Sequence, residues 1–443
     1  MEPHKHAHEQ LRREVEHLFQ KGDPSSALSL FKQLRDNSPE DPEIASEFLF
    51  LLHFARTAPE ALFLEHRRFA RRFEPRGFVP MKAWPHKRTG KIRIGYLSPD
   101  IYGQASHYVL APLLRGHNKR HFEIFVYATH PARDSYTEEI AGYADAWRLI
   151  GHKEYAAIRA AARHDEIDIL VDLAGHSGIN SMPAFAERAA PIQISWFGYM
   201  DTTGLANIDY RFTDEMRVPK GRDNFYSEHL FYLPNSYSFS PHENACDFSR
   251  TRDTNDIVTF GSLNTPHKIN KEVLETWATL LQKVPTSRLL FLACPDKKYS
   301  EWLRNFFASY GVDPFRVEPR PRQEMSQFLK TVSEIDVALD PFPYTGGITT
   351  YHALSVGIPT VTLEGTTEYE RNCAAIMREA GLPDWIVHTK EEYIAKAAAF
   401  GAAHELRKNL RATLPRELVA RSGAFVHDVE EAYQVMFQKS HLT

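Results

Sequence analysis

Residues 336–354 read DVALDPFPYTGGITTYHAL, and this stretch decides which kind of fold to expect. The apolar run that ends at Asp340 predicts a buried strand, and the apolar-periodic residues after the turn predict a helix. Two adjacent glycines, Gly346 and Gly347, lie in the turn and let the backbone come close to a ligand. A strand, a glycine turn and a helix in this order are typical of an α/β protein with a parallel sheet.

The start of the predicted helix is a candidate anion site. The N–H groups of Ile348, Thr349 and Thr350 have no partner within the helix, and the positive end of the helix dipole favours an anion, most simply a phosphate. The threonine hydroxyls add further donors. The alternative is an ordinary strand-to-helix turn in which a threonine caps the helix.

A second polar turn occurs in residues 260–277, FGSLNTPHKINKEVLETW. Asn264, Thr265, His267 and Lys268 lie between a buried strand and a helix, so Lys268 can reach a diphosphate as a point charge. A single lysine is usually part of the solvated surface. Here both turns follow strands of one predicted sheet, and a shared anion accounts for both of them.

From Lys91 onward, short apolar runs alternate with longer helical patterns, which predicts doubly wound sheets with helices on both faces. The predicted strands are 91–98, 122–128, 168–175, 192–198 and 230–234, followed by 257–263, 287–294, 336–342 and 358–365. They define two Rossmann-like domains at 91–245 and 256–390, and 240–256 suits a linker. Residues 391–443 are expected to form helices that brace the first of these domains.

The first ninety residues have a different pattern. Apolar residues at helical spacing predict about one and a half helical hairpins of the tetratricopeptide type over 1–90, with 74–91 as a linker. We interpret this segment as a short cap on the following domain. The alternative, a superhelix that binds peptides, needs three or more repeats.

Composition excludes several classes of protein. The chain has 443 residues and a formal net charge of -4, which gives no overall basic field for a nucleic acid. Its three cysteines have neither disulfide-scaffold nor zinc spacing, which favours a reducing compartment. The N-terminus has no apolar signal region, and no apolar run is long enough to span a membrane. We therefore expect a cytoplasmic protein.

Five strings together carry a resemblance to a known family: IRIGYLSPD, DILVDLAGHSG, RAAPIQISWFGYMDTTGLANIDYRFTD, FGSLNTPHKI and LDPFPYTGGITTYHALSVGIPTVTLEG. Over roughly residues 45 to 435 the chain resembles the catalytic region of the O-linked N-acetylglucosaminyltransferase family, including bacterial members with short helical N-termini. The resemblance implies a GT-B fold, in which two Rossmann-like domains face each other. It also implies binding of a UDP-sugar mainly by the C-terminal half, and inverting transfer of the sugar to a protein hydroxyl.

The resemblance also assigns roles on the donor side. Lys268 matches the lysine that neutralises the departing diphosphate, and Thr349 with the amide of Ile348 matches the phosphate-binding positions. His352 falls where many members place an acidic residue on the ribose. The predicted donor-binding set is Asn264, Thr265, His267, Gly346, Gly347, Ile348, Thr349, Thr350 and His352.

Other positions depart from the family pattern. Thr265 and His267 stand where members often carry Gln and Tyr, and Gly347 replaces a histidine of the phosphate turn. Because backbone amides and Lys268 supply most of the expected phosphate contacts, these changes bear more on the identity of the sugar than on nucleotide binding.

The acceptor side has three candidate residues. His176 matches a histidine that many bacterial members have near the sugar, or it is a structural histidine at a strand end. Gln104 stands where the family usually has the histidine once proposed as the base, and His107 follows three residues later. Together with Lys268, these three residues form the predicted catalytic set, with His176 favoured over His107 as the base.

These patterns support one leading hypothesis, a UDP-sugar-dependent glycosyltransferase that acts on Ser or Thr of a protein or peptide, with GlcNAc as the first candidate sugar. No Asp-x-Asp pair occurs in the chain, so we expect neither metal nor cofactor, with Lys268 and a helix N-terminus stabilising the leaving group. UDP-glucose or another donor, a non-protein acceptor, and nucleotide-sugar binding without turnover remain alternatives. The sequence leaves the acceptor and the oligomeric state open.

Overall fold

The structure, a computed structural model, describes residues 2–74, 76–84, 90–242, 245, 257–401, 403–420 and 424–442. The chain divides into two compact units. We call Met1–Leu34, His53–Arg56 and Pro241–Ala420 the six-stranded unit, and Arg35–Leu52, Thr57–Ser240 and Arg421–Thr443 the seven-stranded unit. Most of the predicted linker 240–256, and part of the predicted linker 74–91, lie outside the described residues.

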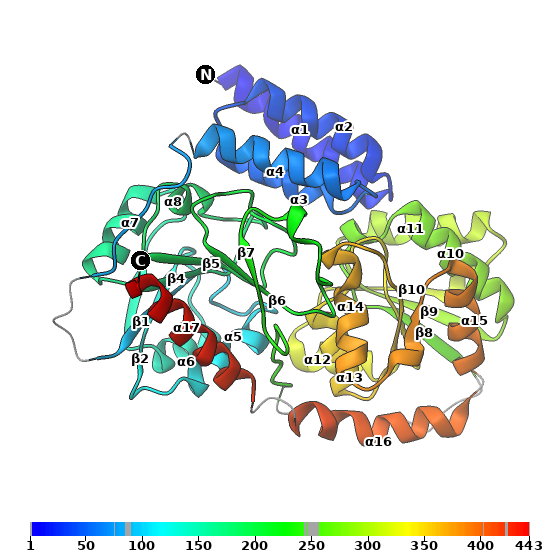
Figure 1. The fold of residues 1–443 in the computed structure, drawn as a ribbon. Helices are drawn as coiled ribbons and strands as arrows, with labels where there is room; N and C mark the ends of the chain where they lie inside the picture. The colour runs from blue at the N-terminus through cyan, green and yellow to red at the C-terminus, as the bar shows by residue number, and fades with distance from the viewer. Residues whose placement is uncertain are drawn as a thin grey trace. The chain divides into compact units, whose positions relative to one another are not determined.

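Each unit contains one parallel sheet, and the two sheets share a strand order (Figure 1). The order is β3-β2-β1-β4-β5-β6-β7 in one unit and β10-β9-β8-β11-β12-β13 in the other. The strands of the seven-stranded unit are β1 (Ile92–Ser98), β2 (Phe122–Ala128), β3 (Ala146–Leu149), β4 (Ile169–Asp172), β5 (Ile192–Ser195), β6 (Tyr210–Thr213) and β7 (His229–Tyr232). Those of the six-stranded unit are β8 (Val258–Ser262), β9 (Ser287–Cys294), β10 (Val317–Pro321), β11 (Val337–Leu339), β12 (Thr360–Leu363) and β13 (Ile386–Val387). Both orders are that of a doubly wound Rossmann fold, which confirms the predicted fold class.

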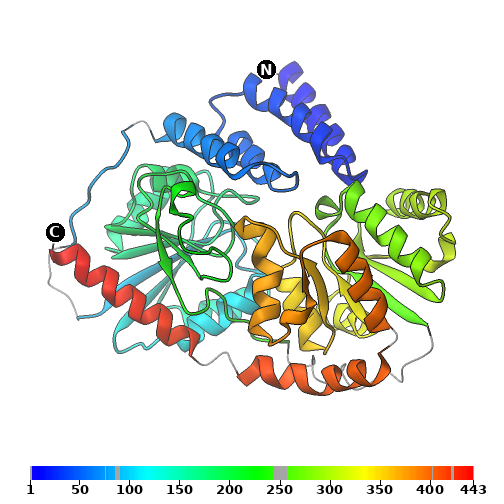
Figure 2. The same ribbon diagram turned by 45° about the vertical axis from the view of Figure 1, so that its right-hand side comes forward.

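Helices connect the strands. The six-stranded unit contains α1 (Glu2–Gln20), most of α2 (Pro24–Asn37), η2 (Pro266–Lys268), α10 (Lys271–Lys283), α11 (Lys297–Ser309), η3 (Pro314–Arg316), α12 (Met325–Val332), α13 (Ile348–Ser355), α14 (Glu368–Glu379), η4 (Pro383–Trp385), α15 (Lys390–Gly401) and α16 (His404–Ala420). The seven-stranded unit contains α3 (Pro42–Leu52), α4 (Pro59–Phe73), α5 (His107–Gly116), α6 (Ser135–Tyr143), α7 (Tyr155–His164), α8 (Met182–Ala186), η1 (Asp223–Phe225) and α17 (Phe425–Leu442). Figures 1 and 2 show α10 with α15 on one face of the six-stranded sheet, and α12, α13 and α14 on the other.

Four strands lack the apolar signal by which the others are predicted. β10 has the sequence VEPRP, and its prolines are tolerated because β10 is an edge strand. β13 is also an edge strand and has only two residues. β3 is a third edge strand, with mixed polarity, and β6 carries the charged Arg211 in its centre.

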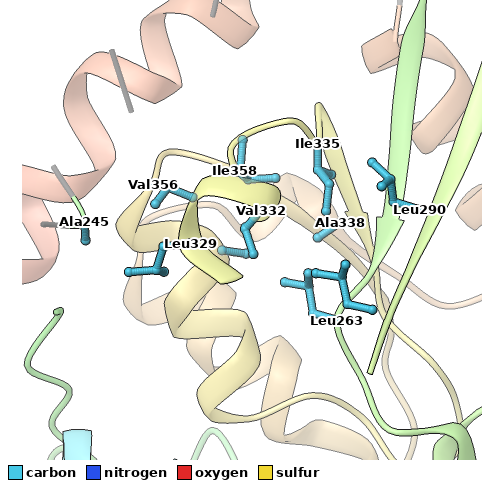
Figure 3. Packing of buried hydrophobic residues seen from close by; sticks show 11 residues of the cluster. Ala245, Leu263, Leu290, Leu329, Val332, Ile335, Ala338, Val356 and Ile358 are labelled. Carbon is cyan, nitrogen blue, oxygen red and sulfur yellow. The ribbon is translucent and has the colours of Figure 1, made fainter. Parts of the chain in front are cut away.

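A compact apolar cluster packs the strands of the six-stranded unit against α12 and α13 (Figure 3). It joins β9, β11, α12 and the segment after α13 through Leu290, Ala338, Val332 and Val356, all of them buried. The close packing of these side chains holds β11 and α13 against the rest of the sheet.

The structure confirms a helical N-terminal segment, but the segment is not a single cap on the following domain: α1 and most of α2 belong to the six-stranded unit, whereas α3 and α4 belong to the seven-stranded unit. The carbonyl of Gly22, in the turn between α1 and α2, accepts the N–H of Lys271 at 2.9 Å. A buried Phe19 of α1 packs edge-on against Phe54, with ring centroids 5.7 Å apart. The first turn of α10 is therefore capped by a carbonyl from the N-terminal helices.

The C-terminal helix α17 packs within the seven-stranded unit. Tyr433 of α17 shares a 3.0 Å hydrogen bond with Tyr96 of β1, and Glu430 accepts a hydrogen bond from His117 at 3.0 Å. Among the helices that the structure describes, none combines the length and the low polarity required to cross a bilayer.

Candidate active site

The two polar turns predicted from the sequence follow neighbouring strands. β8 and β11 pair in parallel, with Val337 opposite Phe260, so their carboxyl ends lie at one edge of the sheet. The winding of the sheet reverses between these two strands, which is where doubly wound proteins bind ligands. Lys268 follows β8 in η2, and the glycine turn follows β11.

The glycine turn is held from inside by a buried carboxylate. Asp340 accepts the N–H of Gly346 at 2.6 Å and the hydroxyl of Thr362 at 2.6 Å. The Gly346 carbonyl in turn accepts the side-chain amide of Asn372 at 3.0 Å. A Cβ on Gly346 would lie 2.6 Å from the Thr350 hydroxyl and 2.9 Å from the Asp340 carboxylate, so a side chain at this position would displace both partners.

The turn leads into the N-terminus of α13. Gly347 is the N-cap residue and has no capping side chain, so the N–H groups of Ile348 and Thr349 are directed out of the helix start, whereas the Thr350 N–H donates to the Gly347 carbonyl at 2.9 Å. The hydroxyl of Thr349 donates to the Asn264 side-chain carbonyl at 3.4 Å, which ties this turn to the loop after β8. The geometry is that of an anion site at a helix N-terminus.

Lys268 supplies the cation of the site. Its ammonium donates to the Thr345 carbonyl at 2.7 Å and lies 4.2 Å from the centroid of the Tyr344 ring. Burial is the main cause that lowers the pKa of Lys268 to about 8, and nearby Asp340 partly opposes it. The lysine is therefore a poorly hydrated cation at neutral pH, and a phosphate would restore the interactions that it lacks.

Asp340 is the other ionisable group of this turn. Burial raises its pKa to about 6, while the hydrogen bonds from Thr362 and Gly346 and the charge of Lys268 work in the opposite direction. Asp340 was not among the residues predicted for the site. The available signal was its place at the end of an apolar strand, directly before the turn.

The remaining donor-side residues lie at different depths. Thr265 is exposed, and half-buried His267 pairs with Glu16 of α1 at 2.7 Å. His352 is buried inside α13, packed edge-on against Phe328, and burial lowers its pKa to about 3. His352 is therefore a neutral imidazole and cannot replace the acidic side chain that the family often has there.

His176 is enclosed in the seven-stranded unit. Its side chain has no exposed surface, its Nδ1 is 2.8 Å from the Ser46 hydroxyl, and its Nε2 donates to the Thr203 carbonyl at 2.9 Å. Both ring nitrogens are thus used within the protein. This geometry favours the structural role that the sequence had left open for His176.

His107 and Gln104 lie near the end of β1 in the same unit. Gln104 is half-exposed, and His107 is the first residue of α5. The Nε2 of His107 is 3.1 Å from Glu139, whereas its Nδ1 has no hydrogen-bond partner among the described residues. Burial lowers the pKa of His107, so Nδ1 keeps its lone pair at neutral pH. Of the two histidines, His107 is the one with a ring nitrogen that makes no hydrogen bond among the described residues, and this nitrogen is itself buried.

Two Rossmann-like sheets, with an anion site after the first and fourth strands of the second one, define a two-domain α/β protein of the GT-B class. The family model of glycosyl transferase family 41 matches residues 78–254 and 247–432. The chain therefore belongs to glycosyl transferase family 41.

Individual relatives agree with this assignment. The chain is 31% identical over 396 residues to the probable UDP-N-acetylglucosamine--peptide N-acetylglucosaminyltransferase SPINDLY of Oryza sativa subsp. japonica, a match that covers 86% of this chain and 42% of the rice protein. It is 28% identical over 391 residues to the protein of the same description named SEC in Arabidopsis thaliana, with 83% and 40% covered. The chain thus spans less than half the length of these relatives.

A solved structure extends the likeness to three dimensions. A mutant O-GlcNAc transferase of Thermobaculum terrenum superposes with a TM-score of 0.89 at 29% identity. The match covers 96% of this chain and 83% of that chain.

Proposed function

We propose that this chain is an inverting, metal-independent glycosyltransferase that moves a sugar, with GlcNAc as the first candidate, from a UDP-sugar to a Ser or Thr hydroxyl of a protein or peptide. The observation that carries the proposal is the desolvated ammonium of Lys268 beside the glycine turn at the N-terminus of α13. The names of the rice and Arabidopsis relatives support GlcNAc and a peptide acceptor.

The proposed reaction is a single displacement. The acceptor oxygen forms a bond to the anomeric carbon while the bond from that carbon to the diphosphate oxygen breaks, and UDP leaves with the electron pair. Negative charge grows on the diphosphate during this step. Lys268 and the first amides of α13 are in place before the reaction to stabilise that charge, which is the arrangement that lowers a barrier most. We infer metal independence from Lys268 and from the absence of an Asp-x-Asp pair in the sequence.

The hydroxyl proton has two routes in this proposal. It passes to the Nδ1 lone pair of His107, or it leaves through water or a phosphate oxygen, since both nitrogens of His176 are occupied. The pH dependence of kcat separates these routes. A protein base gives a fall in kcat at low pH that His107→Gln abolishes, whereas the solvent route leaves both proteins with the same profile.

A single-turnover assay tests the proposal directly. With UDP-GlcNAc, a pool of Ser- and Thr-containing peptides and excess EDTA, we expect UDP release together with a peptide mass increase of one N-acetylhexosamine. Transfer of a hexose would identify a different donor. Loss of activity in EDTA that Mn²⁺ restores would contradict metal independence.

Two departures from the family pattern favour a second candidate, nucleotide-sugar binding without turnover. Gln104 stands in place of a histidine, and Gly347 removes a side chain from the phosphate turn. Binding of UDP-GlcNAc without UDP release in any peptide or lysate would support this candidate. Mass spectrometry of proteins co-expressed with the chain would identify the acceptor class in the first case.

A further inference from the structure

The turn that contains Tyr344 and Thr345, two residues that contact Lys268, packs against a series of aromatic rings, which we call the column. The Tyr344 ring is stacked on Phe54, with centroids 5.1 Å apart and an interplanar angle of 17°. The Tyr344 ring is also stacked on Tyr369 of α14, at 5.7 Å and 27°. Phe19 of α1 extends the column beyond Phe54. All four rings are buried, with exposed fractions of 6% or less.

This column connects the helical N-terminal segment to the cation of the site. Phe54 lies between α3 and α4, far in sequence from Tyr344, but both belong to the six-stranded unit. The Lys268 ammonium lies 4.2 Å from the Tyr344 ring centroid and is bonded to the next residue, Thr345. Any shift or tilt of Tyr344 therefore moves two of the contacts that place Lys268.

We propose that Phe54 is a positioning residue for Lys268, so that the helical N-terminal segment sets the geometry of the leaving-group site. The proposal rests on the proposed function for the role of Lys268 in turnover, but not for its position. Phe54 touches neither the donor nor the reacting atoms; it acts through Tyr344. The segment predicted as a cap is in this view a working part of the donor site.

Removal of the Phe54 ring is expected to change the electrostatic environment of Lys268 as well as the packing around it. Burial is the largest cause of the lowered pKa of Lys268, and the Tyr344 ring, whose centroid is 4.2 Å from the ammonium, contributes to that burial. The other groups that face Lys268 are Asp340 before the turn and Cys373 of α14, and both raise its pKa. Removing the Phe54 ring would admit water while leaving these two groups in place, so the lysine would be better hydrated and less precisely held.

The test compares Phe54→Leu with Phe31→Leu. Phe31 of α2 is equally buried in the helical segment but does not belong to the column, so it controls for the loss of a core ring. Phe54→Tyr keeps an aromatic ring at this position, next to a groove of about 740 Å³ that Phe54 helps to line. If Phe54→Leu does not fold, Phe54→Met gives the same comparison with a more adaptable side chain.

We expect Phe54→Leu to lower kcat by on the order of tenfold relative to Phe31→Leu, with the donor KM little changed and Phe54→Tyr close to wild type. The pH at which the Lys268 side chain loses its proton, followed by NMR of lysine-labelled protein and assigned with Lys268→Arg, should rise in Phe54→Leu only. Equal effects of Phe54→Leu and Phe31→Leu on both measurements would overturn the proposal. A wild-type chain that binds no UDP would instead overturn the proposed function, and the Lys268 titration would still decide the role of Phe54.

Discussion

The turns that follow equivalent strands of the two sheets, β11 and β4, differ in their chemistry. Asp340 directly follows β11, and Asp172 ends β4; each of these strands lies beside the first strand of its sheet. Each aspartate accepts an N–H from a glycine in the next turn: Asp340 from Gly346 at 2.6 Å, and Asp172 from Gly175 at 2.7 Å. Both carboxylates are buried. The same device therefore builds both turns, and the residues after the glycine decide what each turn can do.

In the six-stranded unit the chain continues into a helix whose first amides are directed outward, and a cation from the neighbouring turn lies beside it. In the seven-stranded unit the chain continues into His176, whose two nitrogens are bonded to Ser46 and Thr203. The first turn keeps polar groups available for an anion. The second uses its polar groups to hold the protein together, so comparable topology alone does not create a site.

The largest expected effect is the loss of turnover when Lys268, the basic side chain beside the glycine turn, is removed. Lys268→Ala should reduce turnover by on the order of a hundredfold or more, because one preorganised charge opposite the diphosphate is lost. Lys283→Ala, at the exposed end of α10, is the matched control and should leave turnover unchanged. The measurement is steady-state kinetics with UDP-GlcNAc. Normal turnover in Lys268→Ala would remove this lysine from the site.

His176→Ala should act on stability instead. Loss of a fully buried imidazole leaves Ser46 and the Thr203 carbonyl without their partner, at a cost of about 2–4 kcal/mol in the free energy of unfolding. Urea denaturation measures this cost, and kcat of the folded fraction should stay within about threefold of wild type. A large loss of kcat at normal stability would return His176 to the role of base that its sequence context first indicated.

The sequence predicted the fold well because the central strands are continuous apolar runs and the glycine turn has a distinctive composition. It missed β3, β6, β10 and β13, since edge position and a buried arginine hide their strand character. Lys268 and the start of α13 could be paired from topology alone. Asp340, Tyr344 and Phe54 could not, because their roles depend on burial and on contacts between residues far apart in sequence.

His176 is a second residue whose role could not be predicted from the sequence alone. Its sequence setting, a histidine at a strand end, is equally typical of a catalytic and of a structural residue. Only the hydrogen bond from Ser46, 130 positions earlier in the chain, distinguishes the two. Long-range contacts of this kind leave no local pattern to read.

A smaller effect is expected from closing the space in the phosphate turn. Gly346→Ala places a Cβ within 2.6 Å of the Thr350 hydroxyl and 2.9 Å of Asp340, which must shift the turn. We expect UDP affinity to fall by about tenfold, since the amides that bind the anion lie next to this position. Gly175→Ala, where φ is +55° and Tyr199 blocks the Cβ, should destabilise the protein and leave the UDP affinity of the folded fraction unchanged. Calorimetry with UDP and thermal melting give the two readouts. Equal loss of affinity in both variants would contradict the division of roles between the turns.

The smallest effect on UDP binding is expected from the two buried carboxylates. Burial is the largest cause in both cases, raising the pKa of Asp340 to about 6 and that of Asp172 to about 7. Each native carboxyl holds its proton more tightly than the unfolded chain does, so its contribution to stability is fully present below the unfolded pKa and is lost as pH rises through the native pKa. Asp340→Asn and Asp172→Asn keep the acceptor oxygen and remove the titration. Relative to Asp340→Asn, wild type should lose about 3 kcal/mol of stability as pH rises from about 4 to above 6, and relative to Asp172→Asn the loss should be larger and continue to above pH 7. Urea denaturation across this range measures both differences.

Because Asp340 faces Lys268 and Asp172 faces Arg211 and Glu228, only Asp340→Asn should also move the pH dependence of UDP affinity. A parallel shift in Asp172→Asn would show that the two turns are not independent.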